Sequence, residues 1–265
     1  MLAPPLSYAA AQDSTIFAQS AAATLRRRFP SDNFSWILMD KSGRVLDRRW
    51  LQAEQPISPG SLLKPFVARA YAEQHGAVFP HVQCAGTSDR CWLPHGHGTL
   101  GLEDALAQSC NAYFLSLSNH LAVEDARNTL MQLGLAGPPR GATPAGLMGL
   151  TEEWRELPLT LAQAYLALFR DAPISRSRIA SGMQRAAFSG TAAAVDSVLG
   201  AGAALAKTGT VRCTHGTRSA VDGFSVVLYP AEQPRILLLL RMHGATGAQT
   251  SVQAAAMLNA LGFRV

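Results

Sequence analysis

Apolar and polar residues alternate along both ends of the chain in a pattern that predicts an antiparallel β-sheet. Turn-forming residues separate the four segments with strand character, which are 34–39, 45–50, 222–229 and 235–242. The sequence Asp40-Lys41-Ser42-Gly43 predicts a hairpin turn between the first two, and residues 230–234 predict a second hairpin. Helical spacing at 15–28 and an Ala-rich amphipathic stretch at 249–261 predict helices, the second of which packs across the sheet.

The middle of the chain, residues 66–199, has mainly helical character and predicts a separate lobe. Within it, residues 134–149 are rich in Gly and Pro and predict a loop. We therefore predict an α/β fold of the α+β type, with an antiparallel sheet flanked by helices, in a single domain over residues 1–265. Its sheet lobe comprises about 30–65 and 200–265, and the functional cleft lies between the two lobes.

Composition and charge exclude several classes of protein for this chain. The chain has 265 residues, and 48% of them are hydrophobic, which excludes a disordered chain. The longest aliphatic run, residues 236–240, is too short to cross a bilayer, so we predict no transmembrane segment in this chain. The net charge is +5, but the basic cluster Arg26-Arg27-Arg28 is typical of the last turn of a helix. We therefore predict no nucleic-acid partner.

Lysine is scarce, so the position of each lysine is informative. The chain has 20 Arg but only three Lys, and Arg keeps its proton under ordinary conditions, whereas a buried Lys can release it. Lys41 lies in the predicted turn, where a solvated lysine is ordinary. The other two lie in the patterns Ser61-Leu62-Leu63-Lys64 and Lys207-Thr208-Gly209, with Ser109-Cys110-Asn111 between them. In this order the three patterns resemble the motif set of the penicilloyl-serine enzymes.

The flanks of these motifs make the resemblance more specific. The matching stretches are Pro59-Gly60-Ser61-Leu62-Leu63-Lys64-Pro65-Phe66, Gly96-His97-Gly98, Ala107-Gln108-Ser109-Cys110-Asn111-Ala112-Tyr113-Phe114 and Lys207-Thr208-Gly209-Thr210. Together they resemble the transpeptidase domain of penicillin-binding proteins, and residues 157–165 are similar to a helix start in those domains. The likeness covers the chain from about Trp36 onward and implies the fold that these transpeptidases share with serine β-lactamases.

For Ser61, Lys64 and Ser109 the resemblance implies catalytic roles. Ser61 and Lys64 are three residues apart at a predicted helix start, so the amine can reach the hydroxyl and remove its proton. Lys64 can act as this base only if burial and a neighbouring cation, Lys207, lower its pKa from about 10.4. Pro65 predicts an irregular first turn. Ser109 is implied as the relay that passes a proton between Lys64 and the leaving amine.

The resemblance implies that five further residues bind the substrate: Asn111, Lys207, Thr208, Gly209 and Thr210. Residues 207–210 are predicted on an edge strand, where the glycine allows a substrate backbone to approach. Asn111 is implied to hydrogen-bond the amide side chain of the substrate, and the lysine and both threonines to hold its carboxylate. The N–H groups of Ser61 and Thr210 are implied as the oxyanion hole. The resemblance implies no cofactor, and we predict no metal in this site.

Three functions are compatible with these motifs. The first is a DD-transpeptidase or DD-carboxypeptidase that forms an acyl-enzyme on D-Ala-D-Ala ends of peptidoglycan stem peptides and is acylated by β-lactams. The second is a serine β-lactamase, whose deacylating water needs a base such as Glu152, Glu153 or Glu156. The sequence Glu156-Leu157-Pro158 departs from the β-lactamase pattern, and these glutamates are also typical of the acidic first turn of a helix. The third is a non-catalytic sensor or binding module that stays acylated.

The cysteines leave several interpretations open. The chain has four, at Cys84, Cys91, Cys110 and Cys213. The first two bracket a turn-rich loop and could form a disulfide in an oxidising compartment. With His95 and His97 they could form a zinc site, although the spacing is poor for one. The last two lie near the motifs and are typical of small packed residues rather than nucleophiles.

The N-terminal residues bear on location. Residues 1–11 end in Tyr8-Ala9-Ala10-Ala11 and resemble the last part of a secretory signal with its cleavage site, or are simply Ala-rich. Because peptidoglycan lies outside the cytoplasm, we predict a location in the periplasm or at the cell surface. The implied partners are a peptidoglycan stem peptide, β-lactam antibiotics and cell-wall proteins.

Overall fold

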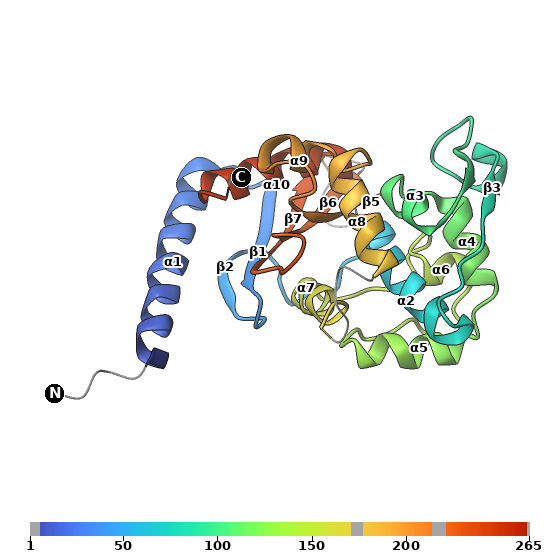
Figure 1. The fold of residues 1–265 in the computed structure, drawn as a ribbon, viewed down its shortest axis with the longest axis horizontal. Coiled ribbons are helices and arrows are strands. Elements are labelled where there is room, and N and C mark those ends of the chain that lie inside the picture. The colour runs from blue at the N-terminus through green and yellow to red at the C-terminus, as the bar shows by residue number, and fades with distance from the viewer. Residues whose placement is uncertain (1–5, 171–176, 214–220, 264–265) are drawn as a thin grey trace.

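A five-stranded antiparallel sheet lies at the centre of the described structure (Figure 1). The computed structural model describes residues 6–170, 177–213 and 221–263. In sheet order β2-β1-β7-β6-β5, the strands are β1 (Phe34–Asp40), β2 (Val45–Arg49), β5 (Leu205–Arg212), β6 (Val221–Tyr229) and β7 (Ile236–His243). Because β1 pairs with β7, the two ends of the chain build one sheet. The predicted fold class, an antiparallel sheet flanked by helices, is confirmed.

Both faces of the sheet are covered, which explains why β7 is apolar at consecutive positions. Successive side chains of a strand point to opposite faces. Leu238 and Leu240 belong to one core, and Leu237 and Leu239 belong to a second core on the other face. The helices that close the first core are α1 (Leu6–Arg28), α9 (Ala194–Leu199) and α10 (Gly247–Ala260). A strand buried on both faces has a continuous apolar run rather than an alternating one.

The remaining elements pack on and beside the other face of the sheet. They are α2 (Lys64–His75), β3 (Val82–Cys84), β4 (Gly98–Leu100), α3 (Leu102–Ala107), α4 (Asn111–Asn119), α5 (Val123–Gln132), α6 (Pro144–Leu147), α7 (Pro158–Ala167) and α8 (Arg178–Phe188), with the 3₁₀ helices η1 (Gly60–Leu63) and η2 (Gly86–Asp89). Phe66 of α2 meets Tyr165 of α7 edge to face, with ring centroids 4.9 Å apart. Tyr165 also donates its hydroxyl to Leu62 O at 2.6 Å, so α7 holds η1 in place.

Some elements differ from those that the sequence predicted. Strands β3 and β4 have three residues each, too few to show an alternating pattern, and they pair antiparallel in a sheet of their own. Helix α6 lies inside the predicted loop 134–149: Thr143 accepts from the N–H of Gly146 at 3.1 Å, and Pro144 opens the helix. Helix α1 begins at Leu6 rather than 15, and residues 1–5 of the proposed signal remnant lie outside the described residues. The division into lobes within one domain stays a prediction.

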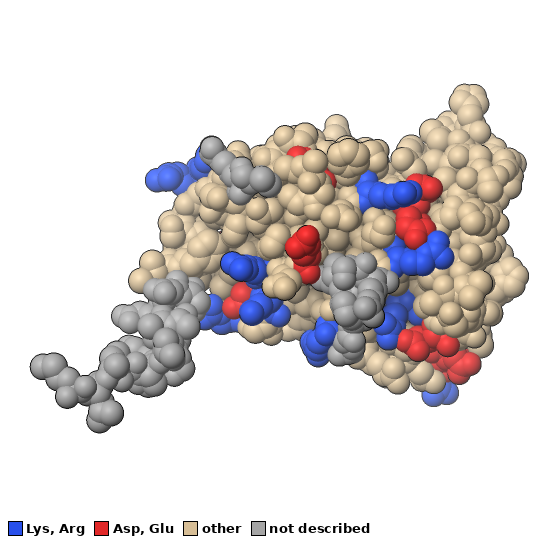
Figure 2. All heavy atoms as spheres, in the orientation of Figure 1, with Lys and Arg blue, Asp and Glu red and all other residues tan. Residues whose placement is uncertain are grey.

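Charges of both signs are dispersed over the face of the molecule shown in Figure 2, where Lys and Arg lie close to Asp and Glu. Some of them form ion pairs, such as Arg178 with Glu103 at 2.6 Å and Arg26 with Asp47 at 2.7 Å. Arg26 thus lies in the last turn of α1, as predicted for the basic cluster. Among the described residues, no helix combines the length and the hydrophobicity that a membrane span requires.

Candidate active site

Ser61 lies in the 3₁₀ turn η1, which leads directly into α2. The N–H of Lys64 donates to Ser61 O, and Pro65 occupies the first turn of α2. The irregular turn predicted from Pro65 is present as η1, although Lys64 itself keeps helical angles. Residues three apart eclipse each other in a 3₁₀ helix, so the side chains of Ser61 and Lys64 emerge on the same side.

Gly60 allows η1 to lie close to its neighbours. Its φ is +55°, and a Cβ on it would lie 2.4 Å from Val211 Cγ1 of β5. On the other side, a Cβ on Gly149 would lie 2.3 Å from Gly60 O. The turn that carries Ser61 is therefore held between the edge strand β5 and the segment at Gly149, with no room for a side chain at residue 60.

Gly60→Ala is expected to lower the free energy of unfolding more than Gly76→Ala does. Both glycines have positive φ, +55° and +62°, where a Cβ costs about 1–2 kcal/mol. At residue 76 nothing lies within 4 Å of the new Cβ, whereas at residue 60 it overlaps Val211, and overpacking adds about 1–3 kcal/mol. Urea unfolding of the two variants measures the difference, and equal losses would contradict it.

The side chains of Lys64 and Lys207 meet at Ser109, although they come from a helix and a strand far apart in the sequence. Lys64 Nζ donates to Ser109 O at 2.6 Å, to Asn111 Oδ1 at 2.7 Å and to Ser109 Oγ at 3.2 Å. Lys207 Nζ donates to Ser109 Oγ at 2.8 Å and to Thr208 O at 2.8 Å. The Ser109 hydroxyl thus bridges the two amines.

Burial changes the proton affinity of both amines. Each lysine has an exposed fraction of 0%. Burial lowers the pKa of Lys64 from 10.5 to about 7, and burial together with the charge of Lys64 lowers the pKa of Lys207 well below its ordinary value. Two cations that share one hydroxyl repel each other, so protons leave this pair more readily than they leave isolated lysines. Near neutral pH, Lys64 is therefore present in part as the free amine.

The turn between α3 and α4 aims Ser109 at the two lysines. Ser109 has a φ of +51°, in the left-handed region that non-glycine residues rarely adopt. The turn is fixed by Ser109 N–H, which donates to Leu106 O at 3.2 Å, and by Cys110 N–H, which donates to Ala105 O at 2.9 Å. Strained backbone of this kind persists where the surroundings over-determine it, which is common at functional sites.

Strand β5 is an edge of the sheet, as predicted for its Lys-Thr-Gly segment. Thr208 Oγ1 lies 2.6 Å from Thr191 Oγ1, within hydrogen-bond distance. The N–H of Gly247, at the start of α10, donates to Thr210 Oγ1 at 2.8 Å. Because this hydroxyl accepts from Gly247, its own proton points elsewhere and can be donated to a ligand.

A cavity of about 690 Å³ lies between β5, η1 and the turn at Ser109. Six of the predicted site residues line it: Ser61, Ser109, Asn111, Thr208, Gly209 and Thr210. The other two, Lys64 and Lys207, lie behind its wall and contact Ser109. Within the described part of the chain, Lys64 makes no hydrogen bond to Ser61. Catalytic hydrogen bonds are often long before a substrate binds and tighten in the complex.

Two residues of this cavity were not found from the sequence. Thr191 contacts Thr208. The preceding residue, Gly190, lies so close to Ala107 that an added Cβ would be 2.2 Å from Ala107 O, so this segment packs closely behind Ser109. Trp92 lines the cavity with a half-exposed ring and donates from Nε1 to Gln108 O at 3.1 Å. In the sequence, the features that could have indicated these two residues are the turn-forming Ser189-Gly190-Thr191 and the position of Trp92 in a polar loop.

The three glutamates considered as deacylation bases have other contacts. Glu156 is buried, and its Oε1 accepts from Trp154 Nε1 and from Ala136 N–H, both at 2.8 Å. Glu153 accepts from the Thr143 hydroxyl at 2.9 Å. Glu152 lines the cavity but pairs with an arginine, Arg155, at 3.4 Å. The three precede α7, which begins at Pro158, so the interpretation as an acidic first turn is wrong.

The sequence of the chain matches a known family over most of its length. A family model described as the penicillin binding protein transpeptidase domain matches residues 38–261. The chain belongs to this family. The resemblance inferred from the motifs is therefore confirmed. A search of curated protein sequences finds no significant match.

Solved structures of penicillin-binding proteins share the fold of this transpeptidase-family domain. The apo transpeptidase domain of penicillin-binding protein 3 from Burkholderia pseudomallei is 14% identical, with 94% of this chain and 93% of that chain covered and a TM-score of 0.67. PBP2 from Pseudomonas aeruginosa, in complex with WCK 5153, is 18% identical, with 94% and 76% covered and a TM-score of 0.70. PBP2 from Helicobacter pylori, in complex with MreC, is 15% identical, with 92% and 62% covered and a TM-score of 0.70.

The family as a whole has known classes of ligand and a known place of action. Penicillin-binding proteins bind β-lactams and peptidoglycan substrates. Their transpeptidase domains act on peptidoglycan outside the cytoplasm.

Proposed function

We propose that this domain is a serine DD-transpeptidase or DD-carboxypeptidase that forms an acyl-enzyme on Ser61. Its substrate is the D-Ala-D-Ala end of a peptidoglycan stem peptide, and β-lactams acylate the same serine. The observation that best supports this proposal is the meeting of Lys64 and Lys207 at Ser109, behind a cavity whose wall carries Ser61. A partly deprotonated amine on the same side of a turn as a serine hydroxyl is an arrangement that activates a nucleophile.

In the acylation step, Ser61 Oγ attacks the carbonyl carbon of the D-Ala–D-Ala peptide bond. The free amine of Lys64 accepts the hydroxyl proton, and the N–H groups of Ser61 and Thr210 stabilise the oxyanion. When the C–N bond breaks, the leaving amine takes a proton through Ser109, which accepts hydrogen bonds from both lysines. D-Ala departs, and an ester joins the remaining peptide to Ser61. Transfer of the acyl group to an amine or to water then restores the serine.

Substrate binding uses the edge of β5 and the amide of Asn111. The terminal carboxylate accepts hydrogen bonds from the hydroxyls of Thr208 and Thr210, with the amine of Lys207 behind them. Asn111 uses one amide N–H on Arg90 O at 3.1 Å, which leaves the other for the substrate's amide. Gly209 keeps the strand edge free of a side chain, so the substrate backbone can approach it.

The β-lactamase alternative lacks a free carboxylate at the cavity. Among the described residues, Glu152 is the carboxylate that lines it, and this group pairs with Arg155. Without a dedicated base for the deacylating water, a penicilloyl ester on Ser61 is expected to be long-lived. This favours a peptidase or transpeptidase that β-lactams inhibit over an enzyme that destroys them.

Turnover of two substrates separates the alternatives. We expect the purified domain to release D-Ala from a pentapeptide that ends in D-Ala-D-Ala, and to react with nitrocefin in a single stoichiometric burst. Steady nitrocefin hydrolysis without D-Ala release would identify a β-lactamase instead. A burst alone, with no D-Ala release with or without an added amine acceptor, would identify a sensor.

The rate of acylation by benzylpenicillin is expected to rise with pH through the pKa of Lys64. Burial lowers this pKa to about 7, and only the free amine can accept the proton of Ser61. Below the pKa the second-order rate constant should therefore rise by about tenfold per pH unit, and above it the rate constant should level off. Stopped-flow quenching of intrinsic fluorescence gives the rate constants. A rate that is flat or falls as pH rises through this range would contradict the base role.

The proposed reaction also sets the proposed location and partners. Stem peptides lie in the periplasm or at the cell surface, so we propose that the domain acts there alongside other cell-wall proteins. Fractionation of cells that express the protein from its native gene tests this, because recovery from the cytosol alone would contradict it.

A further inference from the structure

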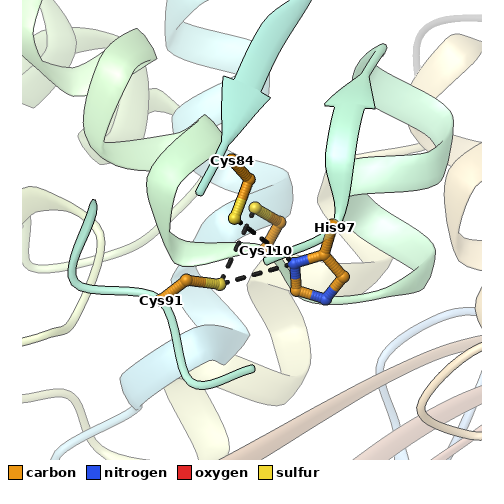
Figure 3. Close-up of side chains that lie close together, drawn as sticks. All are labelled: Cys84, Cys91, His97 and Cys110. Carbon is orange, nitrogen blue, oxygen red and sulfur yellow. Dashed lines mark hydrogen bonds between the residues drawn. The ribbon is translucent and has the colours of Figure 1, made fainter. Parts of the chain in front are cut away.

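Next to the cavity, four side chains from separate segments converge on one point (Figure 3). Cys84 is the last residue of β3, Cys91 follows η2, His97 directly precedes β4, and Cys110 precedes α4. Their ligand atoms, three sulfurs and His97 Nδ1, all lie within 4.8 Å of one another. All four cysteines of the chain, including Cys213, are free thiols, so the structure does not contain the disulfide considered between the first two.

Three distances within this cluster match those between ligands of one tetrahedral metal ion. Zinc–sulfur bonds of about 2.3 Å and zinc–nitrogen bonds of about 2.0 Å place tetrahedral ligands about 3.8 Å apart for two sulfurs and about 3.5 Å apart for sulfur and nitrogen. Cys91 Sγ lies 3.9 Å from Cys110 Sγ, and His97 Nδ1 lies 3.5 Å from Cys91 Sγ and 3.6 Å from Cys84 Sγ. The pocket between them therefore has the size of a zinc ion.

The surrounding backbone holds the ligands in this arrangement. Two glycines allow the loop backbone to pack closely against itself. An added Cβ would lie 2.0 Å from Pro94 O at Gly86 and 2.1 Å from Cys84 O at Gly96, so neither position has room for a side chain. The loop thus folds back on itself with its ligands directed inward.

We propose that Cys84, Cys91, His97 and Cys110 bind one structural Zn²⁺ ion. Three thiolates and one neutral imidazole make a closed set of four ligands, the usual composition of a structural zinc site, with no open position for a substrate. Binding releases the three thiol protons, so the site carries a net charge of −1. The sequence left a zinc site with Cys84, Cys91 and His97 open but did not include Cys110. His95, considered as a ligand from the sequence, is exposed and lies outside the cluster.

The proposed ion would hold one wall of the cavity. Cys110 separates Ser109 from Asn111, so a bond from its sulfur to zinc fixes the turn that presents both side chains. The loop that carries Cys91 also provides Arg90 O, which accepts from Asn111. The same loop carries Trp92, whose ring contacts His97 edge to face with centroids 5.4 Å apart. We infer that zinc positions this wall rather than taking part in the reaction.

Metal content is the first test. The full chain, purified without chelator and desalted, is expected to contain about one zinc per chain by inductively coupled plasma mass spectrometry. Cys84→Ser and Cys91→Ser should lose most of it, whereas Cys213→Ser, which removes the cysteine outside the cluster, should keep it. A wild-type chain that holds no zinc after incubation with ZnCl₂ and gel filtration would overturn the proposal. So would wild-type protein in which these cysteines are joined as disulfides by intact mass.

Cobalt provides a second test that does not depend on the folding of variants. Added to metal-stripped wild-type protein, Co²⁺ should give the strong visible bands of a tetrahedral site and thiolate-to-cobalt charge-transfer absorption, and Zn²⁺ should displace it. Weak octahedral bands, or no charge-transfer absorption, would contradict a site of three thiolates.

The positioning effect rests on the proposed function and has its own readout. Removal of zinc is expected to slow acylation of the wild-type chain by a fluorescent penicillin by about 100-fold, the scale of a displacement of about 1 Å, with recovery when Zn²⁺ is restored. Equal rates with and without zinc would overturn the positioning effect while the metal content still establishes the site. Absence of labelling in every metal state would instead count against the proposed function.

Discussion

Ser61→Ala is expected to reduce covalent labelling by a fluorescent penicillin to background. The hydroxyl of Ser61 lines the cavity, and the proposed chemistry has no other group that can form the ester. Removal of a serine nucleophile from a hydrolase typically costs a factor on the order of 10⁶ in rate, since the remaining groups act only through it. Gel fluorescence after timed incubation with the label measures the loss.

A matched control separates loss of the nucleophile from damage to the turn. Ser58→Ala removes another hydroxyl from the same cavity, three residues earlier, one that is buried and has no hydrogen-bond partner among the described groups. This variant should retain labelling. If Ser61→Ala still labels, or if both variants lose labelling with the fold intact by circular dichroism, the assignment of Ser61 is wrong.

Lys64→Met is expected to slow acylation by about 10²–10⁴-fold, the usual contribution of a positioned general base. Methionine is close to lysine in length and removes the amine that bonds Ser109 and Asn111. Because the base is absent, the residual rate should also lose its rise with pH near 7. The measurement is the second-order rate constant with benzylpenicillin as a function of pH.

The stability of this variant decides whether the kinetic loss reflects chemistry. Replacing a buried charge with an apolar group of similar volume is often neutral or stabilising, whereas unpaired acceptors at Ser109 O and Asn111 Oδ1 cost about 1–3 kcal/mol. We therefore expect a folded protein with a modest change in Tm. Lys41→Met, in the exposed β1–β2 turn, should change neither the rate nor its pH dependence. A Lys64→Met rate within threefold of wild type would contradict the base role.

Local sequence patterns predict the five-stranded sheet better than they predict the elements between residues 66 and 199. The turn at Asp40 to Gly43 is visible in the sequence because Asp40 Oδ1 accepts from the N–H groups of Ser42 and Arg44, and such turns need these residue types. Strands β3 and β4 depend instead on pairing with each other, and a three-residue strand has no period of its own. Helix α6 was concealed because its capping residues lie among glycines and prolines.

The site shows a similar division between local and long-range information. The three sequence motifs were enough to predict that Ser61, Lys64, Ser109 and Lys207 are neighbours, because few other residue types can act as the nucleophile, the base or the proton relay of an acyl-enzyme reaction. The contact of Thr191 with Thr208 could not be predicted, since it depends on how α8 and its following turn pack against β5. The cysteine cluster was predicted only in part for the same reason: Cys84, Cys91 and His97 were considered as zinc ligands, but Cys110 was not. The four ligands are separated by six, five and twelve residues and meet only through tertiary structure.

Locating the acyl group after reaction of the wild-type chain with benzylpenicillin tests the central claim most directly. Peptide mapping by mass spectrometry should find one penicilloyl ester, on Ser61, in the peptide that also carries Lys64. An adduct on another side chain, or an unmodified Ser61 after prolonged incubation of folded protein, would contradict the proposal that these residues form a single acylation centre.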